Sequence, residues 1–446
     1  MRGGLPAKPL ATACLVLTLA VLVFGLAKGW GLGLDRPRRG PATLARLVVS
    51  LDPPPLSPRM LDKDELAPLI GHRDLGLKDL DYFMVESPMG EPLFVKTTLD
   101  PELQPLAQKW VKGAGALRAA LVVLEPASGR ILALAGSGDE EGNAALEGSF
   151  PAASVFKIVT AAAAVEKADY NAMTTVAYDG AKHTLYKGNV SKAPDKGVHQ
   201  ATLREGFAES INSVFGKLGA FSLAPGELEE VAVNFGFNEN LAFEMPLDVS
   251  TFELGDDPGD TFHLAELASG FNRDTRLSPV HGALLASVAL NGGDLFEPNI
   301  VSEVTNLENE IVYRGRPRLL GRAVSPQTAE ELSVLMQAAV SDGTGRKHFS
   351  DAGVHPVLSR LTLGGKSGTI NDDDGARVDW FVAFASPDRE EDDAGQLALA
   401  AVVVHDGQTN TASQELVRKA LISYYRARLG PGKEQEVMAG RPSGRS

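Results

Sequence analysis

Residues 152–165 read AASVFKIVTAAAAV, an apolar run in which Lys157 is the only charged side chain. The run predicts a helix beginning near Ser154, and helical spacing places Ser154 and Lys157 on the same face. Burial among apolar side chains disfavours an ammonium ion, so we expect the pKa of Lys157 to be lowered. A neutral amine next to a serine can take up the hydroxyl proton and activate the oxygen as a nucleophile. The alternative is a serine that only caps the helix.

A second short motif, Ser210-Ile211-Asn212, is the only Ser-x-Asn sequence in the chain. It lies inside a stretch, residues 203–218, whose pattern is otherwise helical. Serine and asparagine side chains compete with the backbone for hydrogen bonds within a helix. A helix cap or a junction between two helices is therefore the simpler structural explanation of this motif.

A third motif, Lys366-Ser367-Gly368-Thr369, ends an apolar run at residues 361–367 that predicts a strand. It is similar to the tail of a phosphate-binding P-loop, but that loop needs a glycine where this chain has an arginine. In a strand, Lys366 and Gly368 share one face, and Ser367 and Thr369 share the other. Because glycine has no Cβ, a ligand backbone can approach the strand closely at Gly368.

The order of the predicted elements indicates the fold class. Apolar runs at residues 118–124 and 130–135, joined by Pro-Ala-Ser-Gly, predict a hairpin. A mainly helical block follows, then β-runs at 361–367, 378–385 and 397–405 and a helix at 413–428. We therefore expect an α/β sandwich, with one antiparallel sheet built from both ends of the domain and helices segregated against it.

Composition excludes several classes of protein. The 446 residues include 57 carboxylates and 43 cations, a net charge of −14, which argues against a nucleic-acid partner. The single cysteine, Cys14, excludes an internal disulfide framework and a multi-cysteine zinc site. We expect no metal and no cofactor.

The most apolar segment lies near the amino terminus. Residues 10–27 read LATACLVLTLAVLVFGLA without a charge, close to the minimum that spans a bilayer. We expect an uncleaved signal-anchor within residues 1–28, although Gly-Leu-Ala at 25–27 suits a cleaved signal peptide. Cations flank both ends, and a literal count would keep the larger part of the chain in the cytoplasm. The chemistry of the three motifs argues for the opposite orientation, with the larger part of the chain outside the cytoplasm.

The rest of the chain divides into three parts by composition and hydrophobic pattern. Residues 29–92 are rich in proline and glycine and predict a linker or small pedestal with at most one short helix, near 63–70. Residues 93–429 have the pattern of one globular domain. Residues 430–446 predict a disordered tail.

Together, and in this order, the three motifs resemble those of the penicillin-binding protein transpeptidases and the serine β-lactamases. They are separated by 56 and 156 residues, counted between Ser154, Ser210 and Lys366. Residues 97–104, TTLDPELQ, are similar to the entry to the transpeptidase domain of bifunctional penicillin-binding proteins. Further similar stretches are SINSVF at 210–215, SPVHGA at 278–283, NGG at 291–293 and DWFV at 379–382. The resemblance spans residues 93–429.

The resemblance implies a set of catalytic roles. Ser154 would attack the penultimate D-Ala carbonyl of a peptidoglycan stem peptide, and Lys157 would take its proton. Ser210 would relay a proton to the leaving amine, with Lys366 providing positive potential beside it. The acyl group would then pass to an amine of a neighbouring stem peptide, and β-lactams would acylate Ser154 as substrate mimics.

The same resemblance implies how the substrate is held. Asn212 would bind the substrate amide, and Ser367 and Thr369 would bind the terminal carboxylate beside Gly368. The backbone N–H groups of Ser154 and Thr369 would form the oxyanion hole, in which each donor is worth roughly 3–4 kcal/mol in comparable enzymes.

Several functions on this fold stay open. A β-lactamase is disfavoured because no Glu-x-x-Leu-Asn element follows Asn212. A D,D-carboxypeptidase, or an inactive scaffold or sensor, remains an alternative. Residues 29–92 are too few for the glycosyltransferase domain of bifunctional relatives. We therefore expect a monofunctional enzyme of the bacterial inner membrane, with its catalytic domain outside the cytoplasm and a separate glycan polymerase as partner.

Overall fold

The computed structural model describes residues 59–429, except 72, 74, 76–81, 139–142, 258 and 390–393. The expected membrane segment at residues 10–27 and the expected tail at 430–446 lie outside this part of the chain. Among the residues described, no helix has the length and apolar character needed to span a bilayer.

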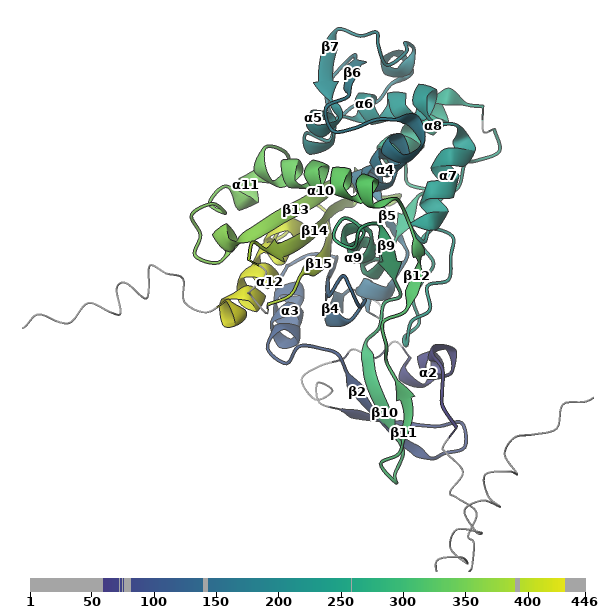
Figure 1. The fold of residues 1–446 in the computed structure, drawn as a ribbon, viewed down its shortest axis with the longest axis vertical. Helices are drawn as coiled ribbons and strands as arrows, with labels where there is room; N and C mark the ends of the chain where they lie inside the picture. Colours follow the sequence, from purple (N-terminus) through teal and green to yellow (C-terminus); the bar gives the residue numbers. More distant parts are fainter. Residues whose placement is uncertain are drawn as a thin grey trace, which may run out of the picture. The chain divides into compact units, whose positions relative to one another are not determined.

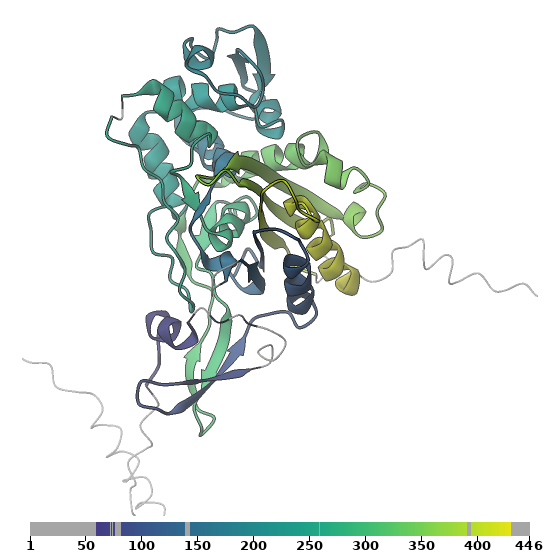
Figure 2. The ribbon, with the colours of Figure 1, turned by 180° about the vertical axis from the view of Figure 1, so that it is seen from behind.

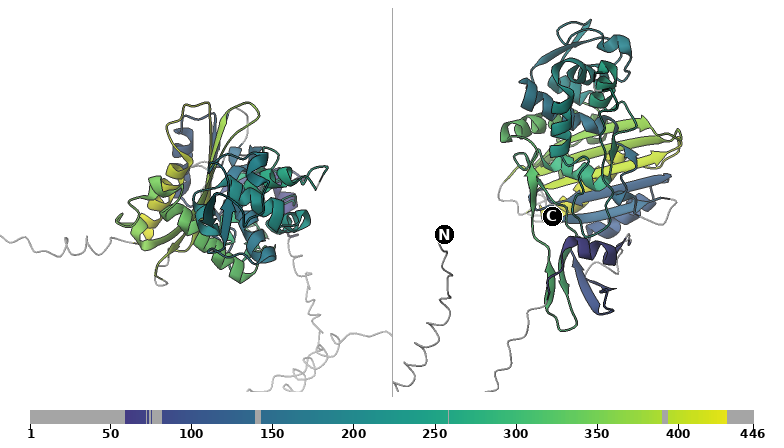
Figure 3. Two further views of the ribbon diagram at one scale, coloured as in Figure 1. Left: turned by 90° about the horizontal axis from the view of Figure 1, so that it is seen from above. Right: turned by 90° about the vertical axis from the view of Figure 1, so that its right-hand side faces the viewer.

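A five-stranded antiparallel sheet forms the centre of the domain, in the order β13-β14-β15-β3-β4. Strands from the two ends of the domain meet in its middle, where Val402 of β15 lies opposite Ala120 of β3 (Figure 3, right). Every residue of β15 is buried, as its unbroken apolar sequence requires. The predicted antiparallel sheet and its hairpin are confirmed. The strands are β3 (Arg118–Leu124), β4 (Ile131–Ser137), β13 (Leu361–Asn371), β14 (Arg377–Pro387) and β15 (Leu397–His405).

Helices cover both faces of this sheet. On one face, α3 (Leu103–Lys112) and α12 (Ser413–Arg428) pack against a core that includes Phe381 and Leu399 (Figures 1 and 2). On the other face, α9 (Pro279–Ser287) is buried along its whole length. A Cβ added at Gly282 would lie 3.3 Å from the side chain of Ala400, so this helix approaches the sheet closely.

The helical block lies beyond α9 and carries most of the remaining core. Phe156 stacks on Phe252 and meets Phe237 edge-on, with ring centroids 5.0 and 5.4 Å apart. The antiparallel pair of β6 (Thr175–Tyr178) and β7 (His199–Thr202) stands at the outer end of the block (Figure 1). The helices of the block are α4 (Lys157–Ala168), α5 (Leu203–Ala208), α6 (Asn212–Lys217), α7 (Pro225–Asn234) and α8 (Thr261–Ser269). Two more helices contact the central sheet directly: α10 (Pro326–Ser341) packs against β13, and Phe349 of α11 (Arg346–Phe349) stacks on Phe381. Short strand pairs are β5 (Phe150–Pro151) with β8 (Arg276–Leu277), β6 (Thr175–Tyr178) with β7 (His199–Thr202), and β9 (Asp294–Phe296) with β12 (Leu319–Arg322).

A second, four-stranded sheet stands apart from the first, in the order β1-β2-β10-β11. It joins strands far apart in sequence, because β2 pairs with β10. The helix α2 (Lys63–Ile70) lies beside it, and Lys63 Nζ donates to Glu297 Oε2 at 3.0 Å. The strands are β1 (Phe83–Glu86), β2 (Pro92–Thr97), β10 (Val301–Thr305) and β11 (Ile311–Arg314). The sequence patterns did not predict β10 and β11.

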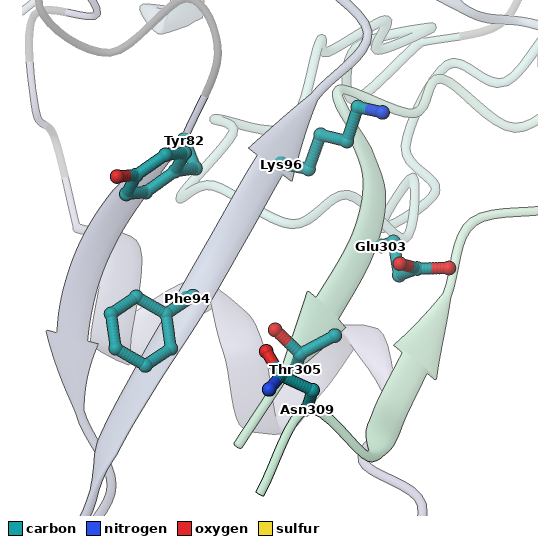
Figure 4. Close-up of a pocket in the computed structure, with 6 residues that line it drawn as sticks. All are labelled: Tyr82, Phe94, Lys96, Glu303, Thr305 and Asn309. Atoms are coloured by element: carbon teal, nitrogen blue, oxygen red, sulfur yellow. The ribbon is translucent and has the colours of Figure 1, made fainter. Parts of the chain in front are cut away.

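A hollow of about 520 Å³ lies on one face of this second sheet. Aromatic side chains of Tyr82 and Phe94 form one end, and the polar side chains of Lys96, Glu303, Thr305 and Asn309 form the rest (Figure 4). None of these six lining residues belongs to the three sequence motifs. The motif residues come together elsewhere, between the helical block and β13.

Candidate active site

Ser154 lies in a 3₁₀ turn, Ala153–Phe156, that leads into α4. The expectation that the α-helix begins near Ser154 needs correction, because the α-helix itself begins at Lys157. Ala153, just before the serine, has the left-handed φ of 48°, a strained backbone state for a residue with a Cβ. Such strain persists only where the surroundings impose it, and here Gly270 packs directly against the Ala153 carbonyl.

The Lys157 amine contacts three oxygen atoms and is completely buried. Its Nζ lies 2.7 Å from Ser154 Oγ and donates to Asn212 Oδ1 at 2.8 Å and to the Ser269 carbonyl at 2.5 Å. A neutral amine has two N–H groups and one lone pair. Because two of the three partners are carbonyl oxygens that only accept, the lone pair is left for the Ser154 hydroxyl proton.

Electrostatics favours this neutral form of Lys157. Burial lowers its pKa well below the ordinary lysine value, and the nearby charge of Lys366 lowers it further. The ring of Phe215 lies 5.6 Å from Nζ, a cation–π contact that acts in the opposite direction but does not outweigh burial. This arrangement can deprotonate the serine without a histidine or a carboxylate.

The Ser-x-Asn motif marks a junction between two helices. The helix expected over residues 203–218 is interrupted: α5 ends at Ala208, α6 begins at Asn212, and Ser210 between them has a φ of 54°. Asn212 Nδ2 donates to the His183 carbonyl at 2.9 Å. This bond turns Oδ1 of Asn212 toward Lys157.

Lys366 connects the strand motif to the helix junction. Its Nζ is fully buried and donates to Ser210 Oγ and to the Ser367 carbonyl, each at 2.9 Å. Burial lowers the pKa of Lys366 to about 7. Near neutral pH this lysine can therefore exist in both protonation states beside Ser210.

The other residues of the third motif also lie on β13, which is the edge strand of the central sheet. Ser367 Oγ lies 2.6 Å from Thr344 Oγ1. Thr369 Oγ1 donates to Asp379 Oδ1 at 2.7 Å. A Cβ added at Gly368 would lie 3.2 Å from the Val155 backbone nitrogen, so the strand passes close to the turn that holds Ser154.

Sequence patterns missed three contributors to this site. Ser269 and His183 act through backbone carbonyls, which no side-chain motif can reveal. Thr344 lies between two glycines after α10. The adjacent Gly343 could have indicated that this loop packs closely against another element. A Cβ there would lie 2.2 Å from the Ala208 carbonyl and would push the loop away from α5.

Replacing Gly270 by alanine is expected to damage both stability and the site. Its φ is 63°, and the added Cβ would lie 2.0 Å from the Ala153 carbonyl and 3.2 Å from the Ser154 nitrogen. We expect about 2–4 kcal/mol of destabilisation and about 100-fold slower acylation of Ser154, because the serine is displaced. Thermal unfolding and acylation kinetics measure the two effects.

The matched control is Gly292→Ala, where φ is 58° and no atom lies within 4 Å of the added Cβ. It carries the left-handed strain alone, about 1–2 kcal/mol, and should leave the acylation rate unchanged. Equal effects in the two variants would show that the contact with Ala153 is unimportant.

A buried lysine paired with one serine hydroxyl, on an antiparallel α/β sandwich, is the arrangement of an acyl-transferring serine enzyme. Residues 119–422 match the family model for the penicillin binding protein transpeptidase domain, and the chain belongs to this family, as its sequence motifs predicted.

Relatives and solved structures agree with this assignment. The peptidoglycan D,D-transpeptidase PbpA of Mycobacterium tuberculosis (strain CDC 1551 / Oshkosh) is 28% identical over 356 residues, covering 70% of this chain and 68% of that protein. The D,D-transpeptidase domain of a peptidoglycan glycosyltransferase from Eggerthella lenta has a similar fold, with a TM-score of 0.60 at 24% identity, covering 74% of this chain and 82% of that one. The crystal structure of PBPA from Mycobacterium tuberculosis gives a TM-score of 0.59 at 23% identity, covering 75% and 80% of the two chains.

Proposed function

We propose that this protein is a peptidoglycan D,D-transpeptidase that cross-links stem peptides through an acyl-enzyme on Ser154. The single observation that carries the proposal is the contact of 2.7 Å between Ser154 Oγ and the buried amine of Lys157. Membership of the transpeptidase family and the names of the relatives support the same activity.

In the first half-reaction, Ser154 Oγ attacks the penultimate D-Ala carbonyl while Lys157 Nζ takes up the hydroxyl proton. The tetrahedral oxyanion is held by the backbone N–H groups of Ser154 and Thr369. Its collapse breaks the amide bond, and the leaving D-Ala amine receives a proton through Ser210. The contact between Lys366 Nζ and Ser210 Oγ supports this relay.

In the second half-reaction, the amine of a neighbouring stem peptide attacks the acyl ester. The amine loses a proton, an amide forms, and Ser154 regains its hydroxyl. Asn212 positions the substrate amide, and Ser367 and Thr369 receive the terminal carboxylate next to Gly368. Among the described residues β13 pairs with β14 alone, which supports this binding mode, because an extended peptide can pair with an edge strand.

β-Lactams would acylate the same serine, since their strained amide takes the place of the D-Ala-D-Ala bond. Complexes of penicillin-binding protein A from Mycobacterium tuberculosis with ceftriaxone and imipenem are described as acyl-enzymes. We expect the corresponding adduct on Ser154 of this chain.

The same proposal sets the place of the protein in the cell. Peptidoglycan is assembled outside the cytoplasmic membrane, so residues 1–28 would anchor the chain and residues 93–429 would work outside the cytoplasm. Residues 29–92 would form the connecting linker or pedestal, and the described part of this range, α2 and β1, packs beside β2 of the four-stranded sheet. A separate glycan polymerase would supply the strands. Normal wall synthesis in cells lacking every candidate polymerase would contradict this partnership.

The acceptor separates transpeptidase from the alternatives. The full chain is incubated with a stem peptide ending in D-Ala-D-Ala, with and without a second peptide bearing a free side-chain amine, and products are identified by mass spectrometry. We expect release of D-Ala and a new amide that joins the two peptides. Hydrolysis alone, with the acceptor present, would indicate a D,D-carboxypeptidase. In a separate incubation with penicillin, rapid release of the bound penicillin would indicate a β-lactamase.

A further inference from the structure

The hydroxyl proton of Thr369 is donated to a carboxylate of the protein itself. Thr369 on β13 lies directly opposite Asp379 on β14. The two side chains therefore share one face of the sheet, and Thr369 Oγ1 donates to Asp379 Oδ1 at 2.7 Å.

Two further residues donate to the same carboxylate. Arg377 Nε lies 3.1 Å from each oxygen of Asp379. His405 Nε2 lies 3.0 Å from Oδ2. The Gly407 backbone N–H donates to His405 Nδ1 at 3.1 Å, which leaves the ring proton on Nε2, facing Asp379. Asp379 is thus held in place by three donors, of which Thr369 is the one that lies in the third motif.

This contact limits what Thr369 can offer a ligand. A threonine hydroxyl has one proton, and while Asp379 accepts it, only lone pairs remain for other partners. A terminal carboxylate has no proton to donate. It must therefore draw the Thr369 proton away from Asp379 before the two can form a hydrogen bond.

We propose that Asp379 is a positioning residue that controls the donor capacity of Thr369 and thereby weakens binding of ligands with a terminal carboxylate. This inference rests on the proposed function, in which Thr369 receives that carboxylate. Asp379 touches neither the reacting serine nor Lys157. Its effect is therefore on binding rather than on the chemical step.

Asp379→Asn tests the proposal, because an amide oxygen accepts a hydrogen bond less strongly than a carboxylate. The rate of Ser154 acylation is measured against penicillin G concentration, which separates the binding constant from the limiting rate. We expect about 3- to 10-fold tighter binding, with the limiting rate unchanged. Thermal unfolding verifies that the variant is folded.

A double-mutant cycle shows whether the effect passes through Thr369. In a Thr369→Ala background, Asp379→Asn should change binding by less than about twofold, whereas in a Thr369→Ser background the tightening should return. The matched control is Asp388→Asn. Asp388 accepts from Thr362 Oγ1 at 2.9 Å, in a pair that joins the far ends of the same two strands, and its loss should leave binding unchanged.

Three results would overturn the proposal. One is a tightening of the same size in the Thr369→Ala background, which would mean that Asp379 acts by charge alone. Another is weaker binding in Asp379→Asn. The third is an equal change with a penicillin whose carboxylate is esterified. If the wild-type chain is not acylated at all, the proposed function fails instead, so the two failures are distinguishable.

Discussion

Replacing Ser154 by alanine is expected to abolish covalent labelling by fluorescent penicillin and to lower cross-linking by about 10⁴-fold or more, as loss of a catalytic nucleophile does in serine enzymes. The reason is chemical, since Lys157 keeps its position but no oxygen remains to form the ester. Among the described residues the Ser154 hydroxyl makes one hydrogen bond, that with Lys157, so its loss should change the free energy of unfolding by about 1 kcal/mol.

Ser213→Ala is the matched control for this variant. Ser213 is buried, whereas Ser154 is half-buried, and it lies one residue from Asn212; its hydroxyl has no hydrogen-bond partner among the described residues. Labelling of Ser213→Ala should equal that of the wild type. Labelling of Ser154→Ala at the wild-type rate would exclude Ser154 as the nucleophile.

Replacing Lys157 by alanine is expected to slow acylation by about 10²–10⁴-fold, the usual contribution of a general base. It also leaves Asn212 Oδ1 and the Ser269 carbonyl without their donor inside the protein, which should cost about 1–3 kcal/mol of stability. The pH dependence separates the two effects. Because the base must be neutral, the wild-type rate should fall as the pH drops through the lowered pKa of Lys157. The residual rate of Lys157→Ala should lack this fall.

Lys217→Ala provides the control for removing a buried lysine. Lys217 is also fully buried, and its Nζ donates to three backbone carbonyls, those of Ala177, Ala193 and Lys196. It should lose stability but retain the acylation rate of its folded fraction. A wild-type rate that rises only in the ordinary pH range of lysine would contradict the role of Lys157.

The central sheet was predictable because β3 and β15, at its middle, are almost continuous apolar runs. β3, β15 and α12 occupy the residues expected from their patterns. The strands β10 and β11 were not predictable, because their residues are partly exposed and β10 pairs with β2, some two hundred residues earlier. Such long-range pairing is decided by tertiary packing and leaves no local periodicity to recognise.

The candidate site was predictable as a set of residue types but not as a geometry. Ser154, Lys157 and Asn212 carry side-chain signals, and the structure brings them together. The 3₁₀ turn at Ser154 and the left-handed backbone at Ser210 depend on packing between helices, which a helical pattern does not encode. Asp379 was visible only as part of a short resemblance, DWFV, and its contact with Thr369 follows from the register of β13 and β14.

The most direct test of the account is mass spectrometry of the full chain after brief exposure to penicillin G. We predict a mass increase of one intact penicillin, carried after digestion by the peptide that contains Ser154, and no increase in Ser154→Ala. An unmodified wild-type chain, or an adduct on another residue that persists in Ser154→Ala, would contradict acyl transfer through Ser154.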